Sequence, residues 1–369
     1  MAGAGDVVGR RALNRATLAR QLLLGRRDLP VVEAVERLAG LNAQDPEPPY
    51  LTLWARLAGF ERDALTRALE DRSVVRGSLL RGTQHMATAA DYLAWRPLLQ
   101  PVLERSRRTF ARATAGIDPD ELAATARRLL AERPLTRPAL GRLLAERWPG
   151  HEPGPLAWSA QCLLPLVHPP PSGTWGVRGP TPFVLAESWL GRPLATPSSP
   201  RNLIERHLAA FGPASVADIQ AWCGLTRLRG PVEQLAPDLR RFRDDHGRVL
   251  YDLPDAPRPD SDTPAPPRFL PYFDNVLLAH ADRTRIMTDD YRKRVCVGAV
   301  VEPTLLIDGQ VVAIWKLVQA PARATLEIQP LEGVPATDLA AASREGELLL
   351  RFAAAEAPDH DIRVLGPGR

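Results

Sequence analysis

The sequence contains few lysines, few cysteines and no long apolar run. Only two of its 47 basic residues are lysines, Lys293 and Lys316, and the other 45 are arginines. This scarcity argues against a lysine nucleophile that forms a Schiff base with its substrate. The three cysteines, Cys162, Cys223 and Cys296, are far apart and odd in number, which argues against a disulfide framework. No stretch approaches the roughly 18 consecutive apolar residues of a membrane span, so we expect no membrane segment.

Patterns typical of metal and phosphate sites are also missing from the sequence. The seven histidines form no His-x-x-x-His pair and have no carboxylate at metal-ligand spacing, and no glycine-rich phosphate loop is present. We therefore expect neither a metal nor a cofactor. The N-terminus lacks the apolar core of a signal peptide, so the expected location is the cytoplasm.

Length and composition indicate a globular protein built from several units. The chain has 369 residues, of which 45% are hydrophobic and 24% are charged, and it is too long for one small domain. The net charge of +4 does not by itself indicate a nucleic-acid-binding protein. Arginine, however, makes planar bidentate contacts with phosphate. The basic clusters at 105–112 and 292–294 are candidates for such contacts, although a solvated helix face is the simpler interpretation of each.

Three helices followed by a two-strand hairpin form a pattern that recurs along the chain. Helical spacing predicts three helices in the first group, at 14–23, 31–41 and 50–57, with a further helical stretch at 61–70. The second group has helices at 118–133, 136–148 and 155–167, and the third has helices at 203–211, 215–223 and 225–235. Strands are predicted at 74–80 and 83–87, at 173–177 and 183–185, and at 249–251. This arrangement is typical of a winged helix, which binds nucleic acid but also serves as a protein-contact domain.

The C-terminal region has a different pattern. Residues 252–268 are rich in proline and aspartate and are typical of a linker. Beyond them, strands are predicted at 295–301, 304–307, 311–315 and 325–329, with a turn at Asp308-Gly309, and a helix at 336–355. We therefore predict an α+β fold, mostly α, with three tandem winged-helix units and a small C-terminal β-rich region. The predicted boundaries are 1–115, 116–195, 196–255 and 256–369.

Two side-chain amides stand out at Asn42 and Gln44, with Ala43 between them and Asp45 after them. Apolar residues at helical spacing lead into this segment and prolines follow it, so the pattern predicts a helix that ends at the amides. The simpler interpretation is that both amides satisfy free backbone groups at the helix end. Asp45 is a weaker candidate for a catalytic base, because a carboxylate before proline is more often a cap or turn residue.

Three longer segments bear on the amide pair. They are Ser-Leu-Leu-Arg-Gly-Thr-Gln-His-Met at 78–86, Pro-Ser-Gly-Thr-Trp-Gly at 171–176 and Leu-Pro-Tyr-Phe-Asp-Asn-Val-Leu-Leu-Ala-His-Ala-Asp-Arg at 270–283. In this order they resemble the AlkZ-like DNA glycosylase family, over about residues 11–318. The resemblance implies tandem winged helices in a C-shaped arrangement, whose concave basic surface fits duplex DNA and is lined by a β-hairpin and a catalytic motif. That motif is Gln-apolar-Gln, or Gln-apolar-Asp in a sister branch; Gln44 matches it and Asn42 departs from it.

The function implied by this resemblance is monofunctional excision of alkylated, N7-modified purines from duplex DNA. Family members also remove bulky natural-product adducts or unhook interstrand cross-links, in self-resistance or base excision repair. Because N7 alkylation makes the base a good leaving group, fixed amide dipoles at Gln44 and Asn42 can suffice for catalysis, although Asn42 is shorter by roughly 1.5 Å. The alternative is a non-catalytic winged-helix DNA-binding protein, either a regulator or a protein that sequesters lesions. A regulator would dimerise, whereas we expect a monomer.

Further candidates for DNA contact are Arg81, Thr83, His85, Trp175 and Arg283. The first three lie at the turn and second strand of the first predicted hairpin. His85 either contacts the DNA or is a half-buried strand histidine. Trp175 either wedges into a groove or packs under the second hairpin. Arg283 either binds phosphate or joins Asp282 in an ion pair that links the C-terminal region to the third unit.

Overall fold

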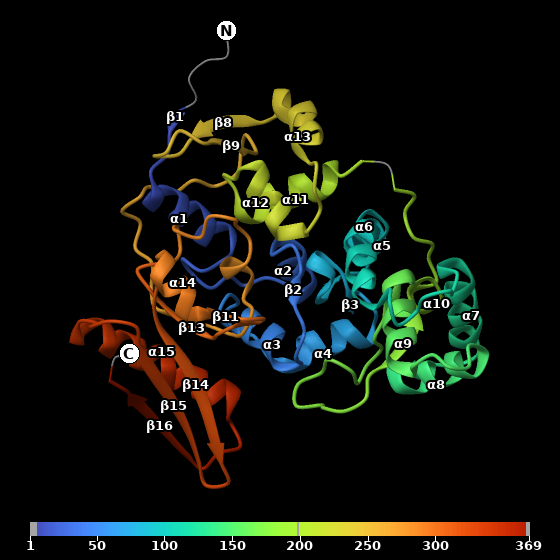
Figure 1. Ribbon diagram of the computed structural model, residues 1–369. Coiled ribbons are helices and arrows are strands. Elements are labelled where there is room, and N and C mark those ends of the chain that lie inside the picture. The colour runs from blue at the N-terminus through green and yellow to red at the C-terminus, as the bar shows by residue number, and fades with distance from the viewer. Residues whose placement is uncertain (1–5, 198, 367–369) are drawn as a thin grey trace.

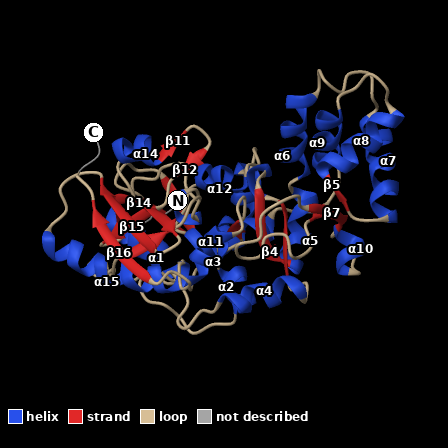
Figure 2. Ribbon diagram, turned by 90° about the horizontal axis from the view of Figure 1, so that it is seen from below, coloured by secondary structure: helices blue, strands red, loops and turns tan. Residues whose placement is uncertain are grey.

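A computed structural model describes residues 6–197 and 199–366 and combines helices with β-sheets (Figures 1 and 2). The N-terminal helices lie centrally, the helices of the second region lie to one side, and the C-terminal sheet lies to the other (Figure 1). This mixed architecture confirms the predicted α+β class in its coarse form. Among the described residues, no helix is both long and apolar enough to cross a membrane.

The N-terminal region contains four helices and the predicted hairpin. The helices are α1 (Arg10–Arg20), α2 (Val31–Arg37), α3 (Glu47–Trp54) and α4 (Arg62–Glu70). Strands β3 (Val74–Ser78) and β4 (Gln84–Thr88) pair antiparallel across a short 3-10 turn, η1 (Leu80–Gly82). The prediction of two strands around Arg81-Gly82 is therefore confirmed.

The predicted helix ending at the amides is wrong. Helix α2 ends at Arg37, and Ala39 and Gly40 then take positive φ angles of 57° and 86° that turn the chain. The next residues form a short strand, β2 (Leu41–Asn42), which pairs with β4. The prolines at 48 and 49 lie in the first turn of α3 and do not end α2. Proline fits there because the first amides of a helix have no intrahelical partner.

Helices α5 (Ala89–Leu98), α6 (Gln100–Arg107) and η2 (Arg108–Phe110) connect the N-terminal region to the second region, a helical cluster with its own strands. The helices of the second region are α7 (Pro119–Glu132), α8 (Arg137–Arg147), α9 (Pro153–Leu163) and α10 (Ala186–Leu190). The predicted strand at 173–177 is wrong, because β7 (Pro182–Leu185) pairs instead with β6 (Leu166–Val167) and β5 (Leu135–Thr136). Residues 168–181 form a long loop between β6 and β7, which we call the 168–181 loop.

One six-stranded sheet joins these two regions, in the order β2-β4-β3-β6-β7-β5. The connection is the pairing of Gly77 in β3 with Val167 in β6. A glycine is required here, because a Cβ on Gly77 would lie 2.7 Å from the Tyr92 ring and 2.8 Å from the Leu166 carbonyl oxygen. The close approach of the two hairpins therefore fixes the second region against the first.

The third region contains α11 (Arg201–Phe211), α12 (Val216–Cys223), α13 (Arg229–Leu235), η3 (Ala236–Asp238) and the hairpin β8 (Arg240–Arg243) and β9 (Val249–Asp252). Strand β1 (Asp6–Val7), from the N-terminal end, adds to β8. Ser215 and Asp218 form a reciprocal capping box at the start of α12, and Gly224 ends this helix with a φ of 83°.

The C-terminal region is a five-stranded sheet covered by a helix. Its strands are β10 (Arg268–Leu270), β13 (Thr304–Ile307), β14 (Gln310–Ala320), β15 (Arg323–Pro330) and β16 (Asp359–Val364), and its long helix is α15 (Ala336–Ala353). The predicted turn at Asp308-Gly309 joins β13 to β14. The single strand predicted at 295–301 is wrong: α14 (Asp289–Val295) leads into the hairpin β11 (Cys296–Val297) and β12 (Val300–Val301). A short η4 (Asn275–Leu277) precedes α14.

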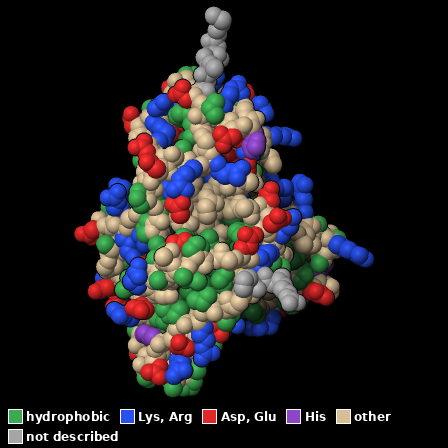
Figure 3. Space-filling view, turned by 90° about the vertical axis from the view of Figure 1, so that its left-hand side faces the viewer, with side chains coloured by type: hydrophobic (Ala, Val, Ile, Leu, Met, Phe, Trp, Pro, Cys, Tyr) green, Lys and Arg blue, Asp and Glu red, His purple; other side chains and the backbone are tan. Residues whose placement is uncertain are grey.

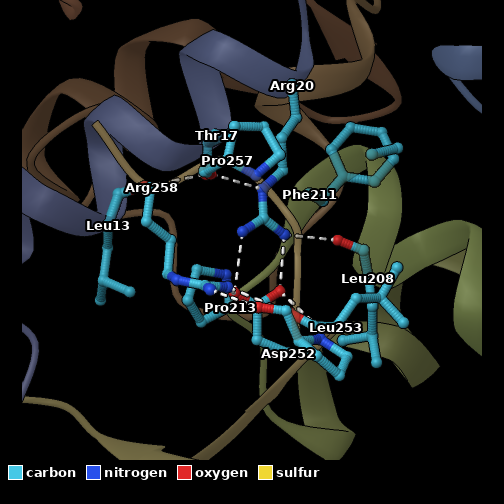
Figure 4. A network of polar contacts seen from close by, with 12 residues as sticks. Leu13, Thr17, Arg20, Leu208, Phe211, Pro213, Asp252, Leu253, Pro257 and Arg258 are labelled. Atoms are coloured by element: carbon cyan, nitrogen blue, oxygen red, sulfur yellow. Dashed lines mark hydrogen bonds and ion pairs between the residues drawn. The ribbon is translucent and has the colours of Figure 1, made fainter. Parts of the chain in front are cut away.

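A buried ionic network holds α1 against the third region (Figure 4). The Arg20 guanidinium donates to both carboxylate oxygens of Asp252, at 2.7 and 2.8 Å, and to the Leu208 carbonyl at 2.7 Å. Arg258 adds a second cation to the same carboxylate at 2.5 Å. The Asp252 side chain is fully buried. The charge of Asp252, at the end of β9, is therefore balanced only while α1 and Arg258 stay against it.

Buried histidines lie at the contact between α11 and the segment after η4. The His207 Nε2 contacts the Ala279 carbonyl and the His280 Nε2 contacts the Phe211 carbonyl, each at 3.0 Å. Burial lowers the pKa of His207 to about 4 and places that of His280 well below its usual value. Burial likewise lowers the pKa of His85 and of His168 to about 3. All four rings are therefore neutral near pH 7.

Because of these buried histidines, we expect the free energy of unfolding to decrease at acidic pH. As the pH falls below the unfolded-state pKa of about 6.5, the unfolded chain binds protons that the folded chain excludes, so the free energy of unfolding falls. The expected loss approaches about 1.4 kcal/mol per pH unit for each buried ring between pH 6 and 4. Urea denaturation across this range measures the slope. A free energy that stays constant from pH 7 to pH 4.5 would contradict the account.

Candidate functional site

A cleft of about 810 Å³ opens between the amide segment, Asn42–Gln44, and the hairpin β11–β12. It brings together residues that are far apart in the sequence. Of the predicted site residues, those that line it are Asn42, Gln44, Arg81, Thr83 and Arg283. The structure therefore gathers both amides and three of the five predicted DNA-contact residues at one place.

The strand pairing of β2 fixes the amide segment. Asn42 is buried and lies opposite His85 in the sheet, and the Ala43 N–H donates to the Gln84 carbonyl at 2.9 Å. The Asn42 side-chain oxygen accepts the Gln44 N–H at 3.3 Å. The Gln44 residue itself is exposed. The two amides therefore differ: Asn42 braces the turn, whereas the Gln44 amide faces solvent in the cleft.

Arg81 connects this cleft to the third region. Its backbone has a φ of 55°, and its Nη1 donates to the Trp222 carbonyl at 2.6 Å, near the C-terminal end of α12. Burial and the nearby Arg283 lower the pKa of Arg81 to about 10, so the guanidinium is still charged at neutral pH. A cation at a helix C-terminus is favourable because the helix dipole is negative there.

His85 lies beneath the cleft and does not line it. It is 1% exposed, its Nδ1 lies 3.0 Å from the Thr83 carbonyl, and its Nε2 lies 3.4 Å from Arg81 Nη2. Its placement thus agrees with the strand-histidine alternative, except that the ring is fully buried and not half-buried. Because the side chain cannot reach a ligand directly, we expect it to support Arg81.

Arg283 faces the cleft, whereas its neighbour Asp282 faces away. Arg283 Nη1 lies 3.1 Å from the Cys296 sulfur, and burial lowers the pKa of Arg283. Asp282 forms an ion pair with Arg248, which also contacts Asp244 at 2.5 Å in the β8–β9 hairpin. The predicted ion pair between the C-terminal region and the third region is therefore made by Asp282 with Arg248, whereas Arg283 contacts Cys296 instead of joining it.

Trp175 and Asp45 lie elsewhere. Trp175 packs edge-on against Tyr50, with ring centroids 5.6 Å apart, and the Arg62 guanidinium lies 4.0 Å over its ring. Both Trp175 and Asp45 line a second cleft of about 790 Å³, next to the C-terminal sheet. The structure thus places Trp175 in a packing role, and Asp45, although it directly follows Gln44, lines this second cleft.

The sequence singled out the basic cluster at 292–294 on the wall opposite the amides but missed the hairpin beside it. Arg292 and Lys293 of α14 line the cleft, together with the hairpin β11–β12. Two valines of this hairpin are exposed, Val297 by 57% and Val300 by 39%. The basic run at 292–294 was a visible signal, but the hairpin was hidden because 295–301 resembles one strand. Phe273, at a φ of 57°, also lines the cleft, and no sequence signal predicts this position.

The charge of the cleft has one dominant sign. Among the described residues, its charged lining consists of four cations, Arg81, Arg283, Arg292 and Lys293, and a single carboxylate, Asp289. By contrast, acidic and basic side chains are interspersed around an apolar patch on the molecular face in Figure 3. The cleft is therefore better suited to a polyanion than that face is. Within the described ranges, no group of three or more His, Cys, Asp or Glu residues could hold a metal ion.

Comparisons with known proteins identify the family of this chain. The curated interstrand DNA cross-link repair glycosylase of Streptomyces sahachiroi is 26% identical over 327 residues, 82% of this chain and 86% of that protein. The solved structure of Streptomyces sahachiroi DNA glycosylase AlkZ matches the fold with a TM-score of 0.76 at 22% identity, covering 97% of this chain and all of the other. A family model described as DNA glycosylase AlkZ-like matches residues 35–352. Because this match spans most of the sequence, the chain belongs to the AlkZ-like DNA glycosylase family.

Proposed function

We propose that the protein is a monofunctional DNA glycosylase that hydrolyses the N-glycosidic bond of N7-alkylated purines in duplex DNA. One observation carries this proposal: the exposed Gln44 amide shares a cation-rich cleft with Arg81, Arg283, Arg292 and Lys293. The name of the curated relative supports the wider substrate range of interstrand cross-links. Bulky natural-product adducts belong to the same chemical class, and self-resistance or base excision repair is the corresponding biological role.

The DNA would lie along the cleft between the amide segment and the β11–β12 hairpin. Arg81, Thr83, Arg283 and the α14 cations contact backbone phosphates, and the exposed valines of the hairpin enter a groove. We further propose that the regions 1–115, 116–195 and 196–255 are winged-helix units and that 256–369 is a separate α+β region. The hairpins β3–β4, β6–β7 and β8–β9, each following a set of helices, support this division.

The proposed reaction needs no strong acid. An N7-alkylated purine carries positive charge, so when the bond between C1′ and N9 breaks, the base leaves as a neutral molecule with the bonding electrons. Water then adds to the oxocarbenium-like C1′ and its proton passes to solvent. The Gln44 side-chain oxygen can hold this water and stabilise the sugar cation, because an amide oxygen is a fixed hydrogen-bond acceptor. Asn42 supports the turn from which Gln44 projects.

Lysine chemistry is not part of this proposal. Lys293 lines the cleft, but its ammonium is paired with Asp290 at 2.8 Å, and such a paired ammonium is a poor nucleophile. A glycosylase without an attacking amine releases the base and leaves an intact strand with an abasic site. We therefore expect alkali-dependent strand breaks, and no covalent adduct trapped by borohydride.

A non-catalytic DNA-binding protein is the second candidate function. The departure of Asn42 from the glutamine of the family motif favours this candidate. The test is to incubate the protein with a duplex carrying a single N7-methylguanine, measuring bound duplex and free base in parallel. Release of 7-methylguanine supports the glycosylase, whereas tight binding of the lesion duplex with no free base, also on a bulky adduct, supports a binder. A monomeric mass in solution is expected for the glycosylase.

Asn42→Gln is expected to raise the rate of 7-methylguanine release. The substitution restores the longer side chain of the family motif and extends the amide farther into the cleft that Asn42 lines, and a displacement of about 1 Å in a positioned group can change a rate about a hundredfold. Single-turnover release at saturating protein measures the effect directly. If the rate falls instead, the cleft is built around asparagine, and release from a bulkier adduct then becomes the comparison to make.

A further inference from the structure

Behind the amide segment, a buried arginine holds its backbone. Arg76 of β3 is 6% exposed, and its Nε donates to the Ala43 carbonyl at 2.8 Å while its Nη2 donates to the Gln44 carbonyl at 3.1 Å. Two successive carbonyls of the amide segment are thus held by one planar group. Because a guanidinium presents its donors in a rigid fork, these bonds fix the direction of the backbone as well as its position.

The third guanidinium nitrogen of Arg76 contacts the 168–181 loop. Its Nη1 donates to the Ser172 Oγ at 3.2 Å, and the backbone carbonyl of Arg76 accepts the His168 N–H at 2.8 Å. Gly173, at a φ of 85°, packs directly against the arginine side chain. A Cβ on Gly173 would lie 2.7 Å from Arg76 Cδ and 3.1 Å from Met86 Cε. The loop therefore forms a close-fitting back wall for the guanidinium.

We propose that Arg76 is a positioning residue, which orients Gln44 through the backbone of the amide segment and is itself held in place by Ser172 and Gly173. This inference rests on the proposed function of the same cleft. Arg76 does not line the cleft among the described residues, so it acts only through Gln44. The second region thereby contributes to the geometry of the reaction through its loop.

The expected effect follows from the geometry. Without the guanidinium, the carbonyls of Ala43 and Gln44 lose their shared donor, and the exposed Gln44 side chain rests on a less constrained backbone. Displacing a positioned group by about 1 Å can lower a rate about a hundredfold while binding through other contacts persists. Arg76 variants should therefore lose rate at saturating DNA and keep their affinity for the lesion duplex.

The test compares Arg76→Met and Arg76→Lys with wild type on an N7-methylguanine duplex. Single-turnover release should fall about tenfold to a hundredfold in Arg76→Met, while duplex affinity stays close to wild type. Arg76→Lys, which restores a cationic donor, should recover part of the rate. The matched control is Arg96→Met, because Arg96 is also a buried arginine and donates to the Leu164 carbonyl at 2.9 Å, away from the cleft. The folded control should release the base at the wild-type rate.

Gly173→Ala provides a test that leaves Arg76 in place. The added methyl should displace the guanidinium and lower the rate, and adding this change to Arg76→Met should have little further effect. Gly176→Ala is its control, because Gly176 also has a positive φ, 73°, but open space around its Cβ position. This pair of variants keeps the test decisive if Arg76→Met does not fold.

Several outcomes would overturn the inference. One is a wild-type rate in both Arg76→Met and Gly173→Ala, and another is a loss confined to DNA affinity or thermal stability. A rate loss in Arg96→Met as large as in Arg76→Met would likewise reduce Arg76 to a structural role. Failure of the proposed function can be distinguished from failure of this inference. In that case the wild-type protein would release no base, or Gln44→Ala would release the base at the wild-type rate.

Discussion

Gln44→Ala is expected to abolish most of the base release while leaving DNA binding largely intact. Gln44 is exposed in the cleft, and its backbone is held by Arg76 and by the Asn42 side chain, so truncation removes the amide without disturbing the fold. Removing one preorganised dipole that stabilises a transition state lowers a rate by about a hundredfold to a thousandfold. The affinity for the lesion duplex should change little, because it depends mainly on phosphate contacts.

The measurement for Gln44→Ala is single-turnover release of 7-methylguanine at a protein concentration that saturates the duplex. Gln234→Ala, at an exposed position on α13, serves as the control and should match wild type. Release by Gln44→Ala within a factor of a few of wild type would show that the amide is dispensable and that other residues of the cleft carry the reaction.

Asp252→Ala is expected to lower the free energy of unfolding by about 3–5 kcal/mol. Its carboxylate is fully buried between Arg20 and Arg258, and the substitution leaves the Arg20 guanidinium buried without its counter-charge (Figure 4). Removing one partner of a buried ion pair is far more costly than removing a surface partner. Because this network joins α1 to the third region, the loss should affect the whole fold.

Urea denaturation of Asp252→Ala and of Asp290→Ala gives the comparison. Asp290 pairs with Lys293 on the surface, where both side chains are largely exposed, so its removal should destabilise the fold far less than the removal of Asp252. If Asp252→Ala were no more destabilising than Asp290→Ala, the network in Figure 4 would contribute little to stability.

Local signals in the sequence predicted the elements that depend on neighbouring residues. The helix starts predicted at 136 and 215, where Thr136 and Ser215 cap α8 and α12, the strands of the first hairpin and the turn at Asp308-Gly309 all agree with the structure. In each case the residues that specify the feature lie within a few positions of it. A side-chain cap or a positive-φ turn acts locally, so its sequence pattern is sufficient.

Elements that depend on distant partners were missed. Strand β2 has two residues and exists because β4, more than 40 positions later in the chain, pairs with it. The helical spacing of apolar residues wrongly predicted that the preceding helix continues through these two residues. Strand β16 pairs with β15 only after the long helix α15 intervenes. The 296–301 hairpin turns at Gly298, at a φ of 59°, within a run that otherwise resembles one strand.

The residues of the candidate site likewise fall into those that the sequence indicated and those whose positions depend on distant parts of the fold. The sequence and its family resemblance singled out Gln44, Arg81 and Arg283, which the structure gathers in one cleft. Burial, however, is set by the whole fold, and it placed His85 beneath Arg81 and Trp175 against Tyr50. Arg76 carries no sequence signal either, because its role depends on the loop that packs behind it.

The most direct test of the account is the product formed by the wild-type protein from a duplex with one N7-methylguanine. The account predicts free 7-methylguanine in solution and a damaged strand that stays intact until alkali breaks it at the abasic site. Tight binding of the duplex without free base, under conditions where every duplex is occupied, would contradict the central claim and leave a DNA-binding protein. Strand cleavage before alkali would contradict the monofunctional mechanism.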